Sequence, residues 1–147
     1  GEVHFHAPID NAASNSTYTT SSREDDNTSP FSAKQALAPG TGYWCSTGKH
    51  EPKDLVIWTG IMHKRRKVRA LKVSWAYAPG WVRVRSTPDG KHWDTVVPWH
   101  KSKEGGVSFQ EDMIFDRPRH SMQVKVDMKR PKEWGYFGIN QASLELA

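Results

Sequence analysis

The feature that most constrains the fold is a succession of short strand patterns with no helical pattern between them. Apolar and polar residues alternate in "VRALKVSWAY" (68–77) and in "WVRVRS" (81–86), as in strands with one buried face. The run "DLVIW" (54–58) is continuously apolar, which is typical of a strand covered on both faces. Four more strands are expected at 94–99, 111–116, 121–128 and 136–147.

Turn signals separate these strands. Asp89-Gly90, between 81–86 and 94–99, predicts a hairpin because both residues tolerate positive φ. The slip in alternation at Ala70-Leu71 indicates a β-bulge. Successive short strands joined by turns predict an all-β, antiparallel sandwich or barrel.

The 147 residues are expected to form one domain, residues 1–147, excised from a larger protein. Seven tryptophans and 36% hydrophobic residues supply material for a core. Residues 10–30 are almost all Ser, Thr, Asn and acidic residues and are expected to be a polar, loop-rich segment. One short helical turn is expected after it, ended by Pro39-Gly40.

Charge and cysteine content narrow the classes of function. Lys and Arg total 21 against 16 acidic residues, and the resulting net charge of +5 favours anionic partners. Cys45 is the only cysteine, so an intrachain disulfide and a multi-cysteine zinc site are both excluded. No apolar run is long enough to span a membrane.

The order of the motifs resembles the discoidin family, also called coagulation factor V/VIII type C domains, among the galactose-binding-like jelly rolls. The resemblance covers nearly the whole chain and is carried by "NAASNS", "SPFSAKQALAPGTGYWCS", "KDLVIW", "VRALKVSW", "WVRVRSTPDGKHWDTV", "SMQVKVDM" and "YFGINQASLEL". It implies a discoidin-like jelly roll of about eight strands that binds its ligand through the loops at one end.

The chain departs from the family pattern in three places. It cannot form the disulfide that often joins the ends of these domains, because it has one cysteine. Ala38-Pro39-Gly40 stands where many members carry an Asp-Gly calcium loop, and the strand 54–58 lacks the usual acidic residue at its end. No cofactor is therefore expected, and the question of calcium stays open.

Antiparallel strands reverse direction at each connection, so alternate loops gather at the same end of a sandwich. Starting from strand 54–58, this rule collects aromatic and cationic side chains at one end, as sugar stacking, insertion into acidic lipid or a protein hot spot requires. The candidate ligand-binding residues are Lys49, His50, Tyr77, Trp81, His100, Lys101, Lys103, Arg130, Lys132 and Trp134. For any single tryptophan, packing in the core is the stronger alternative.

The opposite end holds a basic run in "HKRRKVR" (63–69). Its cations are Lys64, Arg65, Arg66, Lys67 and Arg69. They are expected either to bind a heparin-like, phosphate or acidic partner, or to form a solvated hairpin tip that protects an edge strand, and the second interpretation is favoured.

Catalytic and metal chemistry are weaker interpretations. A nucleophilic Cys45 would need a base such as His50, and packing as a small hydrophobe is favoured. His4 and His6 share a strand face without an identifiable third metal ligand. Asn15 and Asn27 begin N-glycosylation motifs, which favours a secreted domain slightly.

The sequence thus predicts a non-catalytic binding or adhesion module, extracellular or at the cell surface. Its partner would be a glycan, an anionic lipid or a protein, with nucleic acid disfavoured and the oligomeric state open. The alternative is an intracellular scaffold domain of the same fold that mediates protein–protein assembly.

Overall fold

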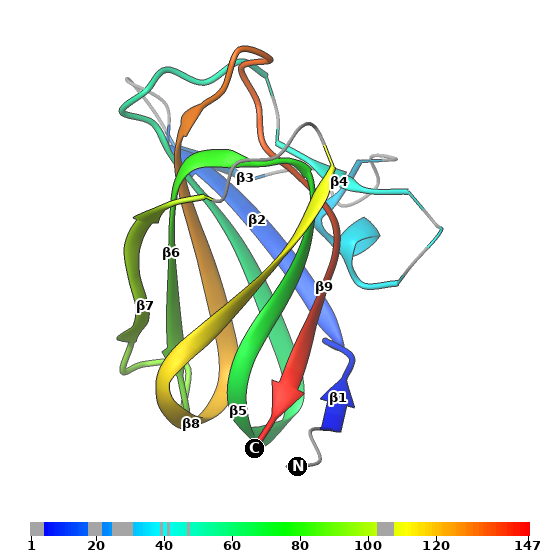
Figure 1. The fold of residues 1–147 in the computed structure, drawn as a ribbon, viewed down its shortest axis with the longest axis vertical. Helices are drawn as coiled ribbons and strands as arrows, with labels where there is room; N and C mark the ends of the chain where they lie inside the picture. The colour runs from blue at the N-terminus through cyan, green and yellow to red at the C-terminus, as the bar shows by residue number, and fades with distance from the viewer. Residues whose placement is uncertain are drawn as a thin grey trace.

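The structure is a computed structural model that describes residues 5–17, 22–24, 31–38, 40, 42–46, 48–102 and 108–147. These residues form β-strands and one short 3-10 helix (Figure 1). The elements are β1 (Phe5–Ala7), β2 (Asn11–Thr17), β3 (Ser22–Glu24), η1 (Ala33–Ala36), β4 (Trp44–Cys45), β5 (Leu55–Tyr77), β6 (Pro79–Thr87), β7 (Asp94–Lys101), β8 (Phe109–Pro131) and β9 (Gly138–Leu146).

Two strands of 23 residues each, β5 and β8, run through both layers of the sandwich. The first half of β5 pairs with β2 and with the second half of β8, which in turn pairs with β6. We call this the β7 layer, since β7 pairs with β6 at its edge. The second half of β5 pairs with β9 and with the first half of β8. β1 and β4 complete this β9 layer, each pairing with a different part of β9. All pairings are antiparallel, so the expected all-β sandwich is confirmed.

The long strands differ from the expected short ones. Segments 55–58 and 68–77 belong to one strand, and so do 111–116 and 121–128, because the backbone stays extended through each bend. Figure 1 shows both strands turning over at the lower end of the molecule. The β5–β8 register shifts between Ile61 and Arg66 and again between Val68 and Ala70, next to the predicted bulge. These irregularities let one strand cross from one layer to the other.

The core lies between the two layers. Three tryptophans are fully buried, and each indole donates a hydrogen bond: Trp44 Nε1 to Ser14 Oγ at 3.2 Å, Trp58 Nε1 to the Ala33 carbonyl at 3.0 Å, and Trp75 Nε1 to Glu111 Oε1 at 3.0 Å. A buried indole retains its full packing energy only when its N–H is satisfied in this way. Cys45 is half-buried beside Trp44, and its thiol donates a hydrogen bond to the Ser46 carbonyl at 3.6 Å. It therefore has a structural place in the fold.

Two local expectations are refined by tertiary pairing. Part of the predicted loop-rich segment is strand: β2 pairs with β5 along its whole length and turns Ala12 and Ser14 into the core. In the run 54–58, Val56 and Trp58 are fully buried, whereas Leu55 and Ile57 on the outer face are only half-buried. The predicted helical turn is present as η1.

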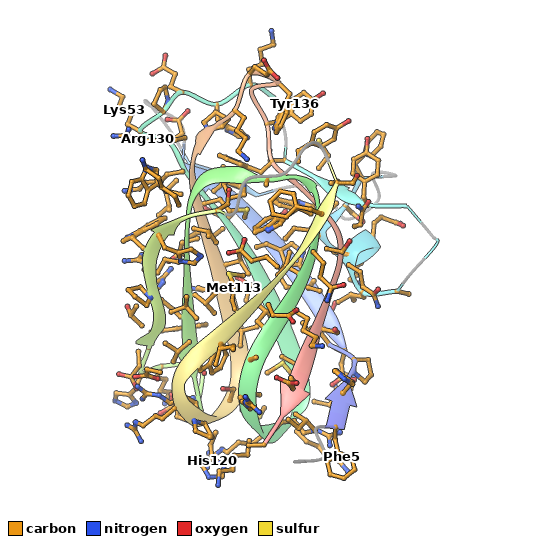
Figure 2. All side chains as sticks on the ribbon, viewed as in Figure 1. Phe5, Lys53, Met113, His120, Arg130 and Tyr136 are labelled. Carbon is orange, nitrogen blue, oxygen red and sulfur yellow. The ribbon has the colours of Figure 1, made fainter. Side chains whose placement is uncertain are left out.

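The sandwich has two chemically different ends. Figure 2 shows Lys53, Arg130 and Tyr136 at one of them, which we call the aromatic end, and His120 and Phe5 at the other, the basic end. The aromatic end includes segment 48–54, the β5–β6 connection and the β8–β9 connection. The basic end includes the bends at 62–67 and 116–120 and the β6–β7 hairpin. Among the described residues, no helix has the length and apolar character needed to cross a membrane.

Candidate functional site

A cleft of about 200 Å³ opens at the aromatic end between two tryptophans. It is lined by Trp81, Trp99, Lys129 and Arg130. Trp81 is the third residue of β6 and is paired with Lys101 of β7 on one side and with Lys129 of β8 on the other. Because Val82 and Val84 turn into the core, the alternation of β6 places Trp81 on the outer face of the β7 layer. We call this hollow the Trp81–Trp99 cleft.

Cationic side chains lie over both indole rings of the cleft. The Arg83 guanidinium lies 4.7 Å from the Trp99 ring centroid, and Lys129 Nζ lies 5.1 Å from it. Lys101 Nζ lies 5.8 Å from the Trp81 ring centroid. These distances are within the range of cation–π attraction. The cleft is therefore both aromatic and positively charged.

A buried carboxylate organises the guanidinium groups next to the cleft. Asp127 is fully buried and accepts hydrogen bonds from Arg83 Nε at 2.7 Å, from Arg85 Nε at 2.6 Å and from Arg85 Nη2 at 2.8 Å. The Asp127 carboxylate thus holds two arginine side chains in place. Their planar guanidinium groups therefore lose little further conformational freedom when they stack on an aromatic ring.

The same pattern continues along the face of the sheet. Arg85 lies 5.8 Å from the Trp93 ring centroid, and Lys125 Nζ lies 4.2 Å from it. Burial, followed by repulsion from Arg85, lowers the pKa of Lys125. A stripe of alternating tryptophans and cations therefore runs across β6, β7 and β8 from the cleft towards the basic end.

The backbone at Arg130 is unusual and helps to shape the cleft. Arg130 has a φ of 57°, a left-handed conformation that a residue with a side chain seldom adopts. Gly80 faces it so closely that a Cβ atom on Gly80 would lie 2.7 Å from the Arg130 carbonyl oxygen. The close approach of these two backbones places the exposed Arg130 at the edge of the cleft.

A second aromatic group surrounds Tyr77 at the same end. Its ring centroid lies 4.8 Å from that of Tyr136, 5.8 Å from Trp134 and 5.9 Å from Tyr43. Burial, and then the neighbouring Tyr77 hydroxyl, raise the pKa values of Tyr43 and Tyr136. Trp134 Nε1 is enclosed and has no hydrogen-bond partner among the described residues. We call these four residues the Tyr77 cluster, since the other three rings each contact Tyr77.

The histidines expected in the loops have structural partners. His50 is 7% exposed, bonds through Nε2 to Ser46 Oγ at 2.9 Å and stacks on Phe137 with ring centroids 5.5 Å apart. It therefore lies in the interior and not on a ligand surface, which corrects its predicted placement. His100 bonds through Nε2 to Glu111 Oε2 at 3.0 Å and through Nδ1 to the Pro98 carbonyl at 2.9 Å.

The remaining predicted ligand-binding residues are divided between the cleft and its surroundings. Trp81 and Arg130 line the cleft, and Lys101 lies over Trp81. Lys132 Nζ lies 5.7 Å from the Phe109 ring centroid, and Lys49 packs along Gly135. Lys103 lies outside the described residues.

Sequence reasoning missed Trp99 and Lys129. A signal for both was present: Trp99 stands near the end of the strand pattern that follows the Asp89-Gly90 hairpin, and Lys129 directly precedes Arg130. The strand pattern does not encode the register between β6 and β8, and it is this register that brings Lys129 opposite Trp81. Register between distant strands is decided by the packing of the whole core.

The other predicted sites are placed as follows. Asn15 is half-buried on β2, paired with Ile57, while Asn27 and His4 lie outside the described residues and His6 is exposed on β1. Within the described ranges, no three His, Cys, Asp or Glu side chains are grouped to hold a metal ion.

Comparison with known proteins identifies the fold. No protein-family profile and no curated protein sequence matches the chain. Among solved structures, chitosan-binding module 1 from the chitosanase/glucanase of Paenibacillus sp. IK-5 superposes with a TM-score of 0.72 at 16% identity, over 96% of this chain and 99% of that one.

Two further structures agree. The family 32 carbohydrate-binding module of NanJ from C. perfringens, solved with galactose, gives a TM-score of 0.71 at 12% identity over 97% of this chain and 99% of that one. A pectin-binding carbohydrate-binding module gives 0.69 at 14% identity over 94% of this chain and 91% of that one. The chain therefore has the jelly-roll fold of these modules, which discoidin-like domains share.

Proposed function

We propose that the chain is a non-catalytic glycan-binding module and that the glycan binds in the Trp81–Trp99 cleft. The observation that carries the proposal is the pair of indole rings bounding a cleft of about 200 Å³ beside Lys129 and Arg130. A sugar ring stacks its C–H face on an indole, and its hydroxyl groups accept hydrogen bonds from ammonium and guanidinium donors. The fold of the three modules above supports the same function.

The charge of the cleft points to an acidic glycan. Among the described residues, every charged side chain that lines the cleft or stacks on its rings is a cation: Arg83, Lys101, Lys129 and Arg130. Asp127 lies beneath them and is already bonded to two arginines. A polysaccharide with carboxylate groups, such as the ligand of the pectin-binding module, is complementary to this surface, whereas the amino groups of chitosan are repelled by it.

The Tyr77 cluster then acts as a framework. Tyr77 and Trp134 pack against each other and against neighbouring tyrosines, so they support the loops of the aromatic end. In this proposal they do not stack on the sugar. Acidic polysaccharides of this kind occur outside cells, and we place the module there or at the cell surface.

Calorimetric titration with oligogalacturonate, neutral galactan and chitosan oligomers tests the proposal. We expect binding of oligogalacturonate by the wild-type chain and about 30-fold weaker binding by Trp81→Ala and by Trp99→Ala, because losing an aromatic anchor costs about 2 kcal/mol. Trp134→Ala is the matched control, since it removes a tryptophan at the same end but outside the cleft. Its affinity should equal that of the wild type.

Three outcomes would contradict the proposal. Folded Trp81→Ala and Trp99→Ala proteins that bind as tightly as the wild type would remove the cleft from the site. A loss confined to Trp134→Ala would move the site to the Tyr77 cluster. Binding to vesicles of anionic phospholipid, with no binding to any of the three glycans, would replace the glycan with a membrane surface.

A further inference from the structure

A second cavity, of about 320 Å³, lies at the basic end. Four segments form it. The β5 bend contributes Arg65, and the β8 bend contributes Arg117, Arg119 and His120. Ser86 comes from β6, Asp94 and Val96 come from β7, and Pro88 lies in the connection between these two strands. Figure 2 shows His120 at the opposite end of the molecule from Arg130. This cavity is therefore separate from the Trp81–Trp99 cleft.

Strand pairing gathers cations from two distant segments around the cavity. Lys67 of β5 is paired with His120 of β8, and Val68 with Arg119. Together the bends present a set of exposed cations: Lys64, Arg65, Arg66, Lys67 and Arg117. The four on β5 were predicted from the sequence together with Arg69, which is half-buried, whereas no local pattern places Arg117 beside them. We call this set the basic cluster.

The carboxylates near the cavity are already occupied. Arg119 Nη2 lies 2.7 Å from Asp116 Oδ2, Arg119 Nε lies 3.1 Å from Asp116 Oδ1, and Arg119 Nη1 lies 3.3 Å from Asp94 Oδ2. These bonds lower the pKa of Asp116 and raise that of Arg119. Arg119 thus ties the β8 bend to β7 as a positioning residue. The side chains of Arg65 and Arg117 make no ion pair with any described residue.

The alternative explanation, that the basic run protects an edge strand, accounts for only part of the cluster. Edge strands carry exposed lysines because their unpaired backbone invites aggregation. β5 pairs with β2 up to Ile61 and with β9 from Val68, so the cations at 64–67 lie in the bend between these pairings, where Arg66 and Lys67 pair with β8 alone. Protection of this short open stretch does not explain why arginines from the β5 bend and the β8 bend line one cavity.

We infer that the basic cluster and its cavity bind sulfate groups of a sulfated polysaccharide. Guanidinium forks match the tetrahedral oxyanion, and Arg65 and Arg117 are the guanidiniums of the cavity that make no ion pair with a described residue. The cluster extends beyond the cavity through Lys64, Arg66 and Lys67, which suits a chain of repeated anions better than one ion. No Trp, Tyr or Phe lines the cavity, so the stacking platform of single-strand nucleic-acid sites is missing.

Heparin is the probe that tests this inference. Binding of the full chain to heparin is compared with that of the double variant Arg65→Gln, Arg117→Gln and of the control Lys34→Gln, Lys53→Gln. Both variants remove two exposed positive charges, but Lys34 and Lys53 lie away from the cavity. We expect the first variant to bind heparin about 5- to 30-fold more weakly, since each exposed ion pair contributes up to about 1 kcal/mol, and the control to bind like the wild type.

Two comparisons identify the ligand chemistry. Desulfated heparin, which retains only carboxylates, should bind much more weakly than heparin, and single-stranded DNA should compete poorly. The same comparisons are made in the Trp81→Ala background, where the cleft no longer contributes: the loss caused by Arg65→Gln, Arg117→Gln should persist there, so a failure of the glycan cleft and a failure of this site are distinguishable. Absence of heparin binding at physiological salt, equal losses in the two double variants, or equal competition by desulfated heparin or DNA would each overturn the inference.

Discussion

At the scale of single residues, one glycine determines the geometry of the candidate cleft. Gly80 and Arg130 face each other where β6 begins and β8 ends, and their backbones approach too closely for a Cβ atom. Arg130 adopts the left-handed conformation at this point although it has a side chain. Backbone held in a sparsely populated region is often found where a binding surface needs an exact shape.

Gly80→Ala tests the importance of this contact. The new Cβ would lie 2.7 Å from the Arg130 carbonyl oxygen and 3.1 Å from the Arg130 Cβ, so the two strands must separate. We expect a loss of about 1–3 kcal/mol in the free energy of unfolding in urea, together with weaker binding of oligogalacturonate.

Gly90→Ala provides the comparison for that variant. Gly90 has a φ of 80°, but the nearest atom to its added Cβ, Gln123 Nε2, would be 3.7 Å away. Backbone strain should destabilise this variant by about 1–2 kcal/mol without changing the affinity for the glycan, because the hairpin is far from the cleft. Equal effects of both variants on binding would show that Gly80 has no special part in shaping the site.

At the scale of elements, the β6–β7 hairpin is held by one carboxylate. Asp89 Oδ1 accepts hydrogen bonds from the backbone N–H groups of Lys91 at 2.8 Å and His92 at 2.9 Å, and Asp89 Oδ2 lies 2.6 Å from His92 Nδ1. The backbone N–H of His92, followed by its side chain, lowers the pKa of Asp89 below 3.8, and the Asp89 carboxylate raises the pKa of His92 above 6.5. The predicted Asp-Gly hairpin is thus reinforced by an ion pair.

The pH dependence of the hairpin follows from these two shifts. The contribution of His92 is complete below pH 6.5 and is lost as the pH rises through its raised pKa, while that of Asp89 is complete above pH 3.8 and is lost as the pH falls through its lowered pKa. Amide hydrogen exchange in the hairpin, measured by NMR and corrected for the intrinsic exchange rate, should be most protected between these values. In Asp89→Asn, the His92 pKa should return to about 6.5; an unchanged His92 titration would show that the ion pair does not form in solution.

At the scale of the whole molecule, β5 and β8 make the two layers one folding unit. Each strand contributes half its length to each layer, and the core contains side chains from both. Unfolding of one layer would therefore remove β5 and β8 from the other layer as well. Cooperative, two-state unfolding is the expected consequence for a chain of this size whose layers share one core.

Urea unfolding followed by two probes checks this expectation. Tryptophan fluorescence and far-ultraviolet circular dichroism should give coincident transitions. Leu144→Ala, which truncates a fully buried side chain of β9, should lower the stability seen by both probes by the same amount, about 2–5 kcal/mol. A shift in one probe alone would mean that the β9 layer unfolds separately.

The site was only partly predictable from the sequence because its members are distant along the chain. Alternation and loop direction correctly brought Trp81 and Arg130 to one end, since strand reversal is a local rule. His50 was misplaced because its loop folds inward onto Ser46 and Phe137, a contact that no local pattern encodes. Trp99 and Lys129 were missed because the register that sets them beside Trp81 depends on core packing.

Local sequence patterns were sufficient to predict the all-β class, the Asp89-Gly90 hairpin, the helical turn before β4 and the separation of an aromatic end from a basic one. These features follow from side-chain periodicity and turn chemistry, which act over a few residues. Three other features depend on long-range pairing: β2 is a strand, β5 and β8 each cross both layers, and Arg65 and Arg117 share a cavity. Pairing between remote segments is selected by the burial of the whole core, which no short stretch of sequence contains.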